Sequence, residues 1–394
     1  MGIERTEDQS WKPSGAEPYR VLWSVIFLTV IFFLHFVTRQ LTGPLLPEIE
    51  LELGLSHTQS GFFVLLMGLG FSLSQLGAAF LAARWGYRRC ILLSILGSAA
   101  AAVVITQAGT FWGLALGYIG VGIAGGLYVP SGIALITTLV QPKDWGKAMG
   151  IHELAPNIAL IVVPFVATAA VVSGSWRYGY FTAALVMFVL GIVYLKTGVD
   201  SDQRPTPPNF SRIREIVTDP SFWKLCILLS IAVGVETGVY SMTPLFLVSE
   251  RGYELSVANQ LLGFSRIPGI ILVLVSGWLT DRLSPATAIK IALGLTGVAV
   301  LGLGSGPDYI MIPSIFVQSA ASACLFPPML SMASSISSNE NRALTLSLSI
   351  SAAPLIGSGL LPAGLAICGD VFSFEAGLAV TSLLVLSGIW IVRG

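Results

Sequence analysis

Apolar residues along this chain are gathered into long runs, and short polar stretches separate the runs. Each run holds about 20 residues or more, the length that a helix needs to cross the hydrocarbon core of a membrane. The pattern therefore predicts twelve membrane-spanning helices, numbered here as spans 1 to 12. The runs cover residues 21–46, 58–82, 90–108, 111–140, 147–172, 178–196, 222–248, 257–280, 286–304, 308–336, 343–367 and 371–392.

One long polar stretch divides the chain into two units of six spans, 21–196 and 221–394. This linker, 197–220, contains charged residues and prolines, followed by a polar-apolar segment, Ser211–Thr218, that we expect on the membrane surface. Residues 1–20 carry seven charges, and no signal-peptidase site follows them. We therefore expect a cytoplasmic tail and a retained first span rather than a cleaved signal peptide.

Lysine and arginine are distributed unevenly between alternate polar stretches. Seventeen of them lie on the side of the two termini, whereas only Arg177 and Arg251 lie in stretches on the other side. Because cytoplasmic loops of membrane proteins are enriched in Lys and Arg, both termini are predicted to be cytoplasmic in a multi-pass protein of the cell membrane. If one span were missing, the positive residues would be divided between both sides of the membrane, so their distribution also supports twelve spans.

The two halves carry traces of an internal repeat. Corresponding segments are Gly43-Pro44-Leu45 with Thr243-Pro244-Leu245, Gly54-Leu55-Ser56 with Glu254-Leu255-Ser256, and the proline pair Pro156 and Pro164 with Pro354 and Pro362. These matches occur in order and in register, which predicts duplication of a six-helix unit. Transporters built from such repeats bind their substrate near the middle of the membrane, between the repeats.

Composition narrows the class of function. Hydrophobic residues make up 54% of the chain and charged residues 11%, against about 25% charged in soluble domains. This excludes a soluble enzyme and a disordered protein. Lys+Arg and Asp+Glu are equal at 21 each, so there is no positive excess that would indicate nucleic-acid binding. Four scattered cysteines predict neither a disulfide framework nor a metal site, and we expect a monomer without cofactor.

Two polar stretches resemble the signature of a known family. Gly277-Trp278-Leu279-Thr280-Asp281-Arg282, between spans 8 and 9, resembles the G-x-L-x-D-R loop of the major facilitator superfamily. The equivalent stretch between spans 2 and 3 keeps Arg84 and Gly86 but has Ala83 where the family has Asp. The resemblance implies an all-α membrane protein with two pseudo-symmetric six-helix bundles. It also implies a central cavity lined by spans 1, 4, 7 and 10. The residues that it implies for the cytoplasmic gating loops are Arg84, Gly277, Asp281 and Arg282.

Two departures from the family pattern argue against multidrug efflux. The family's drug–proton antiporters carry a G-P-x-x-G-G run in span 5, where this chain has Val163-Pro164-Phe165-Val166-Ala167-Thr168. They also usually carry an Arg in span 4, at the position that Tyr118 occupies here.

Charged residues within the spans are few. Each costs about 2.5–3.5 kcal/mol at mid-span on insertion scales and is therefore by default a functional hypothesis. They are Arg39, Glu153, Glu236 and Arg266, and the histidines His35 and His152 accompany them. Spans 3, 6, 9 and 12, which the resemblance places toward lipid, contain no mid-span charge. This segregation predicts a polar cavity at the centre of the molecule.

The two arginines are predicted to bind an anionic substrate. Arg39 lies eight residues before Pro47, a placement that resembles the first-helix Arg of the family's phosphate-ester and related anion carriers. A guanidinium keeps its charge and binds both oxygens of a carboxylate. Either arginine can instead be structural and bond helix carbonyls. Further candidate donors along the cavity are Tyr128, Tyr240, Gln318 and Asn157.

Charge balance suggests how a proton would be coupled to the anion. Two arginines and two glutamates sum to zero, so internal pairing can satisfy the empty cavity. Protonation of Glu236 or Glu153 would release an arginine for the anion, and His35 and His152 are further proton-coupling candidates, although both also fit as packing residues. His152-Glu153 does not begin a zinc-binding H-E-x-x-H motif, because Pro156 replaces the second His.

The sequence thus predicts a secondary transporter of a small organic anion that is embedded in the lipid bilayer and has no nucleic-acid partner. Its partners would be the substrate together with protons or a counter-anion, through proton symport or anion exchange. Efflux and the transport of a neutral or zwitterionic solute are the alternatives. A transporter-derived sensor and an intramembrane enzyme are more remote.

Overall fold

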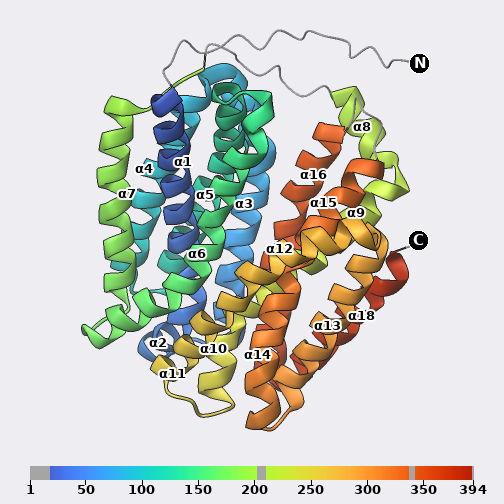
Figure 1. Cartoon of the computed structure of the whole chain (residues 1–394). Coiled ribbons are helices and arrows are strands. Elements are labelled where there is room, and N and C mark those ends of the chain that lie inside the picture. The colour runs from blue at the N-terminus through green and yellow to red at the C-terminus, as the bar shows by residue number, and fades with distance from the viewer. Residues whose placement is uncertain (1–17, 202–209, 337–341, 393–394) are drawn as a thin grey trace.

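The computed structural model describes residues 18–201, 210–336 and 342–392, and within these ranges every regular element is a helix. The helices form two bundles that stand side by side (Figure 1). The N-terminal bundle contains α1 (Pro18–Gln40), α2 (Thr42–Leu53), α3 (His57–Trp85), α4 (Tyr87–Gln107), α5 (Phe111–Leu139), α6 (Trp145–Val172) and α7 (Arg177–Thr197), with the 3-10 turn η1 (Pro142–Asp144) before α6.

The C-terminal bundle follows the short linker helix α8 (Phe210–Thr218). Its elements are α9 (Pro220–Val233), η2 (Gly234–Gly238), α10 (Val239–Ser249), α11 (Leu255–Ser265), α12 (Ile267–Arg282), α13 (Pro285–Ser305), α14 (Asp308–Ala323), α15 (Phe326–Ile336), α16 (Arg342–Pro354), η3 (Leu355–Leu360), α17 (Leu361–Val371) and α18 (Phe374–Ile391). Twelve stretches of these helices are long and apolar enough to cross a membrane, as the sequence predicts.

Span 1 is longer than predicted and is interrupted. α1 ends at Gln40, Leu41 forms a turn, and α2 continues the span to Leu53. Pro44 lacks the N–H that would bond the carbonyl of Gln40, which explains a break at this point. The span ends at Gly54, whose left-handed φ of 61° is typical of a helix C-terminus.

Four spans of the C-terminal bundle are interrupted near its centre. Spans 7 and 11 contain the π-helical segments η2 and η3, and spans 8 and 10 break at Arg266 and at 324–325. π-Helical turns displace backbone carbonyls from the regular hydrogen-bond ladder and are frequent at functional sites. Interrupted spans also surround the substrate sites of many transporters. The breaks therefore indicate the centre of this bundle as a candidate functional region.

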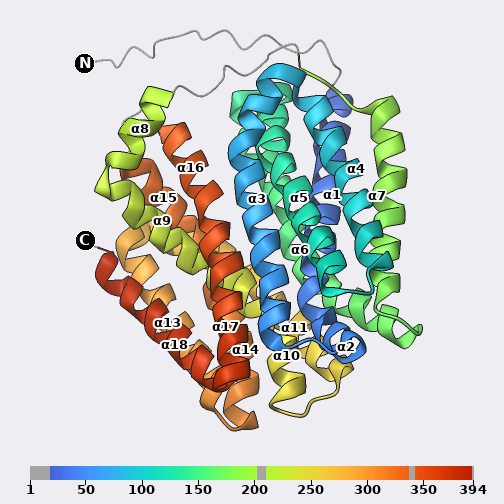
Figure 2. The same cartoon turned by 180° about the vertical axis from the view of Figure 1, so that it is seen from behind.

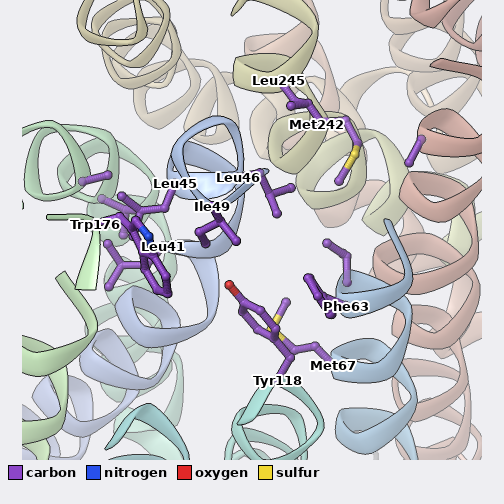
Figure 3. Packing of buried hydrophobic residues seen from close by; sticks show 14 of the residues in the cluster. Leu41, Leu45, Leu46, Ile49, Phe63, Met67, Tyr118, Trp176, Met242 and Leu245 are labelled. Carbon is purple, nitrogen blue, oxygen red and sulfur yellow. The ribbon is translucent and has the colours of Figure 1, made fainter. Parts of the chain in front are cut away.

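The largest apolar cluster that joins the two bundles lies at one end of the molecule. There, one cluster joins Leu45, Ile49 and Phe63 of the N-terminal bundle to Met242 and Leu245 of α10 (Figure 3). Figure 2 shows the opposite end, where α1 begins and α8 lies. Toward this end each bundle has an apolar cluster of its own. The bundles are thus closed against each other at the end away from α8.

Polar contacts strengthen the closed end. The carboxylate of Asp370, at the end of span 11, accepts hydrogen bonds from the backbone N–H groups of His57 (3.1 Å) and Thr58 (2.7 Å) at the start of α3. A carboxylate at a helix N-terminus is favourable because it compensates unpaired N–H groups and the helix dipole. The Nδ1 atom of His57 lies 2.8 Å from an oxygen of Glu50. These contacts tie span 11 to spans 1 and 2.

Two ion pairs at this end reflect the duplication, with their charges exchanged. Arg177, at the start of span 6, pairs with Glu52, and its guanidinium also bonds the carbonyl of Ala108 at 3.0 Å. In the other half Glu375, at the start of span 12, pairs with Arg251 at 3.0 Å, and Arg251 bonds the carbonyl of Gly304. The arrangement is the same although acid and base have changed places. A repeat at the level of the fold thus persists where the sequences differ.

Candidate functional site

A pocket lies where spans 1 and 2 face spans 7 and 11, between the two bundles. Its empty volume is about 360 Å³, including the part that is open to its surroundings. Among the described residues that line it, Arg39 is the one that carries a charge. The N-terminal bundle contributes Arg39, Gln40, Thr42, Gly43, Val64, Met67, Gly68 and Phe71, and the C-terminal bundle contributes Thr237, Ser241, Pro354 and Ser358.

Glycines let the two bundles approach each other around this pocket. A Cβ added at Gly43 would lie 2.6 Å from the Cα of Ser241, and one added at Gly68 would lie 3.0 Å from the Cα of Gly359. Neither position has room for a larger residue without a backbone shift. The pocket is therefore a feature of the interface and not of either bundle alone.

The guanidinium of Arg39 is held between two aromatic rings. Its Cζ lies 4.5 Å from the ring centre of Phe36 and 4.5 Å from that of Phe71 on α3. Cation–π contacts of this kind stabilise the charge while they cover the faces of the planar group. None of the ion pairs among the described residues involves Arg39. The N–H groups at the edge of the guanidinium are thus available to a ligand.

The second buried arginine is already paired. Arg266, which is 5% exposed, donates from Nη1 to Oε1 of Glu236 at 2.8 Å and from Nη2 to the backbone carbonyl of Glu236 at 2.9 Å. Ser322 donates to the other oxygen of Glu236 at 2.5 Å. The pair lies within the C-terminal bundle, and Arg266 is not among the residues that line the pocket. In this conformation Arg39 and Arg266 do not face one shared site.

The π-helical segment η2 explains this arrangement. Its carbonyls depart from the regular helical ladder, and side chains of neighbouring spans bond two of them: Arg266 bonds that of Glu236, and Gln318 bonds that of Val235 at 2.7 Å. The ring of Tyr240 lies 4.7 Å from Cζ of Arg266, and its hydroxyl donates to the carbonyl of Leu160 in the other bundle at 3.1 Å. Gln318 and Tyr240 thus support the pair and the bundle contact.

His35, Tyr128 and His152 meet inside the N-terminal bundle and not at the pocket. Tyr128 and His152 are fully buried, and the Tyr128 hydroxyl donates to the carbonyl of Leu28 at 2.5 Å and lies 3.2 Å from Nε2 of His152. The two ring nitrogens of His35 lie 3.2 Å and 3.0 Å from the hydroxyls of Ser94 and Ser98. Each polar atom has a partner in the core, as the packing interpretation of the histidines expects.

Glu153 and Asn157 lie on the side of α6 that turns toward the other bundle. Thr168, at helical spacing on the same side, contacts Asn259 of α11. The Glu153 side chain is 54% exposed, and its Oε1 lies 3.4 Å from Nδ1 of the buried His152. The amide of Asn157 donates to the backbone carbonyl of Glu153 at 2.9 Å. Glu153 therefore connects the buried histidine to the space beside the bundle interface.

The residues of the gating loops lie at the ends of α3 and α12. Arg84 is exposed in the last turn of α3. Gly277 and Arg282 belong to the last turns of α12, where Cζ of Arg282 lies 4.1 Å from the ring centre of Trp278. The side chain of Asp281 falls outside the described part, so its role stays a prediction.

The pocket contains residues that the sequence argument missed. In the sequence, Gln40, Thr237, Ser241 and Ser358 are uncharged polar residues among many, and Phe71 is one of 20 phenylalanines. The available signal was adjacency, because Gln40 follows Arg39 and Thr237 follows Glu236.

Comparisons with known proteins agree with this architecture. The sequence model of the Major Facilitator Superfamily matches residues 28–312. "Probable nitrate/nitrite antiporter NarK1" of Thermus thermophilus is 27% identical over 298 residues, which are 72% of this chain and 66% of that protein. "Multidrug resistance protein MdtG" of Proteus mirabilis is 26% identical, over 82% of this chain and 81% of that protein. The "Hexuronate transporter" of Escherichia coli is 20% identical, over 94% and 93%.

A solved structure shows the same fold. The crystal structure of a bacterial homolog of the human lysosomal transporter Spinster, in an inward-facing and occupied conformation, superposes with a TM-score of 0.80 at 18% identity and covers 96% of this chain and 97% of that one. The family match and this fold confirm the resemblance carried by the loop at residues 277–282. The chain therefore belongs to the Major Facilitator Superfamily and is a membrane-spanning secondary transporter, not an enzyme.

Proposed function

We propose that this transporter carries a small organic anion whose carboxylate binds the edge of the Arg39 guanidinium. One observation carries the proposal. Arg39 lines the interface pocket, and none of the ion pairs among the described residues joins it to an acid. A largely buried cation without a counter-charge is unfavourable, and an anionic ligand would supply that charge. Two of the relatives compared above are named as carriers of anions, nitrate or nitrite and hexuronate, which supports the proposal.

The position of the pocket fits transport by alternating access. Its walls come from both bundles, so a bound solute contacts both and favours their closure around it. Because the bundles are closed at the end away from α8, solute would exchange from the other end in this conformation. With the predicted orientation, that end faces the cytoplasm.

Proton symport needs a group whose protonation changes the affinity for the anion. Glu236 is the first candidate, because it precedes Thr237 of the pocket wall and Arg266 compensates its charge at 2.8 Å. Protonation of Glu236 would leave the positive charge of Arg266 uncompensated beside the pocket, which favours an anion there. Glu153 is the second candidate, and exchange of one anion for another would need neither residue.

A carrier of neutral or zwitterionic solutes, or an efflux carrier, is the alternative. The two rings that enclose Arg39 at 4.5 Å support a structural role for this arginine, and such a role would leave a polar, uncharged site. The likeness to a protein named for multidrug resistance supports efflux.

The test is anion binding by Arg39→Lys. Lysine keeps the charge but loses the two parallel N–H donors and the stacked plane. Loss of a partner from a buried charged pair costs about 2–5 kcal/mol, so we expect binding at least about 30-fold weaker in isothermal titration of the purified protein with a panel of carboxylates. Arg177→Lys, at the closed end, is the matched control. A folded Arg39→Lys that binds the transported solute as tightly as the parent would favour the neutral-solute alternative.

A further inference from the structure

Gln40 brings an unpaired amide to the pocket. Its side chain is 5% exposed, and its Nε2 has no hydrogen-bond partner within the part of the chain that the structure describes. Buried polar atoms in folded proteins almost always have a partner, so an orphan amide in a pocket points to a ligand. Arg39 and Gln40 both line the pocket, so both can supply N–H donors to a ligand bound there.

The opposite wall presents hydrogen-bond acceptors. The Thr237 hydroxyl donates to the carbonyl of Val233 at 2.9 Å, and the Ser241 hydroxyl donates to that of Gly238 at 2.9 Å. Because the Thr237 hydroxyl already donates its hydrogen to Val233, Ser358 is the donor in the 2.8 Å contact between the hydroxyls of Thr237 and Ser358. The protons of all three hydroxyls are engaged within the protein. Their remaining lone pairs are left to accept from a ligand.

The charge of the lining limits the charge of the ligand. Arg39 is the single cation among the described residues that line the pocket, and none of these residues is acidic. A monoanion balances this charge. A dianion would leave one negative charge uncompensated in a largely buried site, which is unfavourable.

We propose that the substrate is a hydroxylated monocarboxylate, with its carboxylate bound by Arg39 and Gln40 and its hydroxyl groups donating to Thr237, Ser241 and Ser358. This assignment rests on the proposed function and adds the substrate class and a second binding residue. The N–H donors on the side of Arg39 and Gln40 match the carboxylate of such a molecule. The free lone pairs on the opposite side of the pocket match its hydroxyl groups. Gln40 is thereby a specificity-determining residue.

The experiment compares three six-carbon acids as probes. D-Gluconate is a hydroxylated monoanion, hexanoate has the same chain without hydroxyl groups, and D-glucarate is the hydroxylated dianion. We expect the parent to bind D-gluconate at least about tenfold more tightly than either of the others, because each loses hydrogen bonds or charge balance. Gln40→Leu should weaken D-gluconate binding about 10- to 100-fold. Gln75→Leu is the matched control, since Gln75 is also a buried glutamine with an unpartnered atom but does not line the pocket.

The outcomes separate this inference from the proposed function. Equal binding of hexanoate or D-glucarate, no binding of D-gluconate, or parent-like binding by Gln40→Leu would overturn the inference. If another anion then binds in an Arg39-dependent manner, the proposed function still stands. If Gln40→Leu does not fold, Gln40→Glu keeps the shape of the side chain. Its carboxylate should pair with Arg39 and abolish anion binding, and retained binding would count against the inference.

Discussion

Replacement of Glu236 by Gln tests whether a proton is coupled through span 7. The carboxylate of Glu236 accepts from Arg266 at 2.8 Å and from Ser322 at 2.5 Å. Glutamine imitates the protonated carboxyl group and removes the charge, while Arg266 keeps its bond to the backbone carbonyl at 2.9 Å. Breaking a buried pair costs about 3–5 kcal/mol, and the retained bonds place this variant at the lower end. We therefore expect a folded protein of reduced thermal stability.

The effect on the anion follows from the position of the pair. Glu236 precedes Thr237 of the pocket wall, so the pair lies beside the pocket, and a neighbouring unit charge contributes on the order of 2 kcal/mol at an effective dielectric constant of about 20. Protonation of Glu236 should thus tighten anion binding about 30-fold. The parent should bind the anion more weakly in alkaline than in acidic buffer. Glu236→Gln, which cannot ionise, should bind tightly with little dependence on pH.

Uptake into liposomes measures the coupling directly. A gradient of one pH unit supplies about 1.4 kcal/mol per proton, enough for about tenfold accumulation by one-to-one symport. Glu236→Gln should lose this accumulation, whereas counterflow exchange of the anion should continue. Glu153→Gln, in the same assay, examines the second candidate. Proton-driven accumulation by Glu236→Gln equal to that of the parent would refute the reasoning and leave Glu153 as the coupling residue.

Topology, the gating loop and helix packing are open to separate tests. In a background without native cysteines, Ser201→Cys should resist an impermeant thiol reagent in intact cells and react in inverted vesicles, and labelling from outside would reverse the orientation. Asp281→Asn should slow transport with little loss of folded protein, and full activity would remove this loop from the cycle. Gly357→Ala should lower the yield of folded protein, because its Cβ would lie 2.5 Å from the carbonyl of Ser230, whereas Gly364→Ala, with nothing within 4 Å, should match the parent in gel filtration.

The number of spans, the duplication and the family were all predictable from the sequence. Each segment of this chain that crosses the lipid must be apolar and helical, and this requirement is local. The hydropathy of the sequence therefore identifies the spans without knowledge of tertiary contacts. The same requirement makes a charge within a span conspicuous, which is how Arg39, Glu236 and Arg266 were found. The loop at residues 277–282 is contiguous in sequence, so its resemblance to the family could also be recognised directly.

The partners of these charges were decided only by the tertiary structure. Helical periodicity shows which residues share a face, but the rotation of each helix within its bundle depends on packing against other spans. The π-helical turn in span 7 displaces its carbonyls, and together with the break at Arg266 it brings this arginine to Glu236, 30 residues earlier in the chain. Within the described part of the chain Arg39 forms no ion pair, and Gln40 gains importance only because two bundles enclose it. A pocket made by both halves is set by the contact between them, which no local pattern encodes.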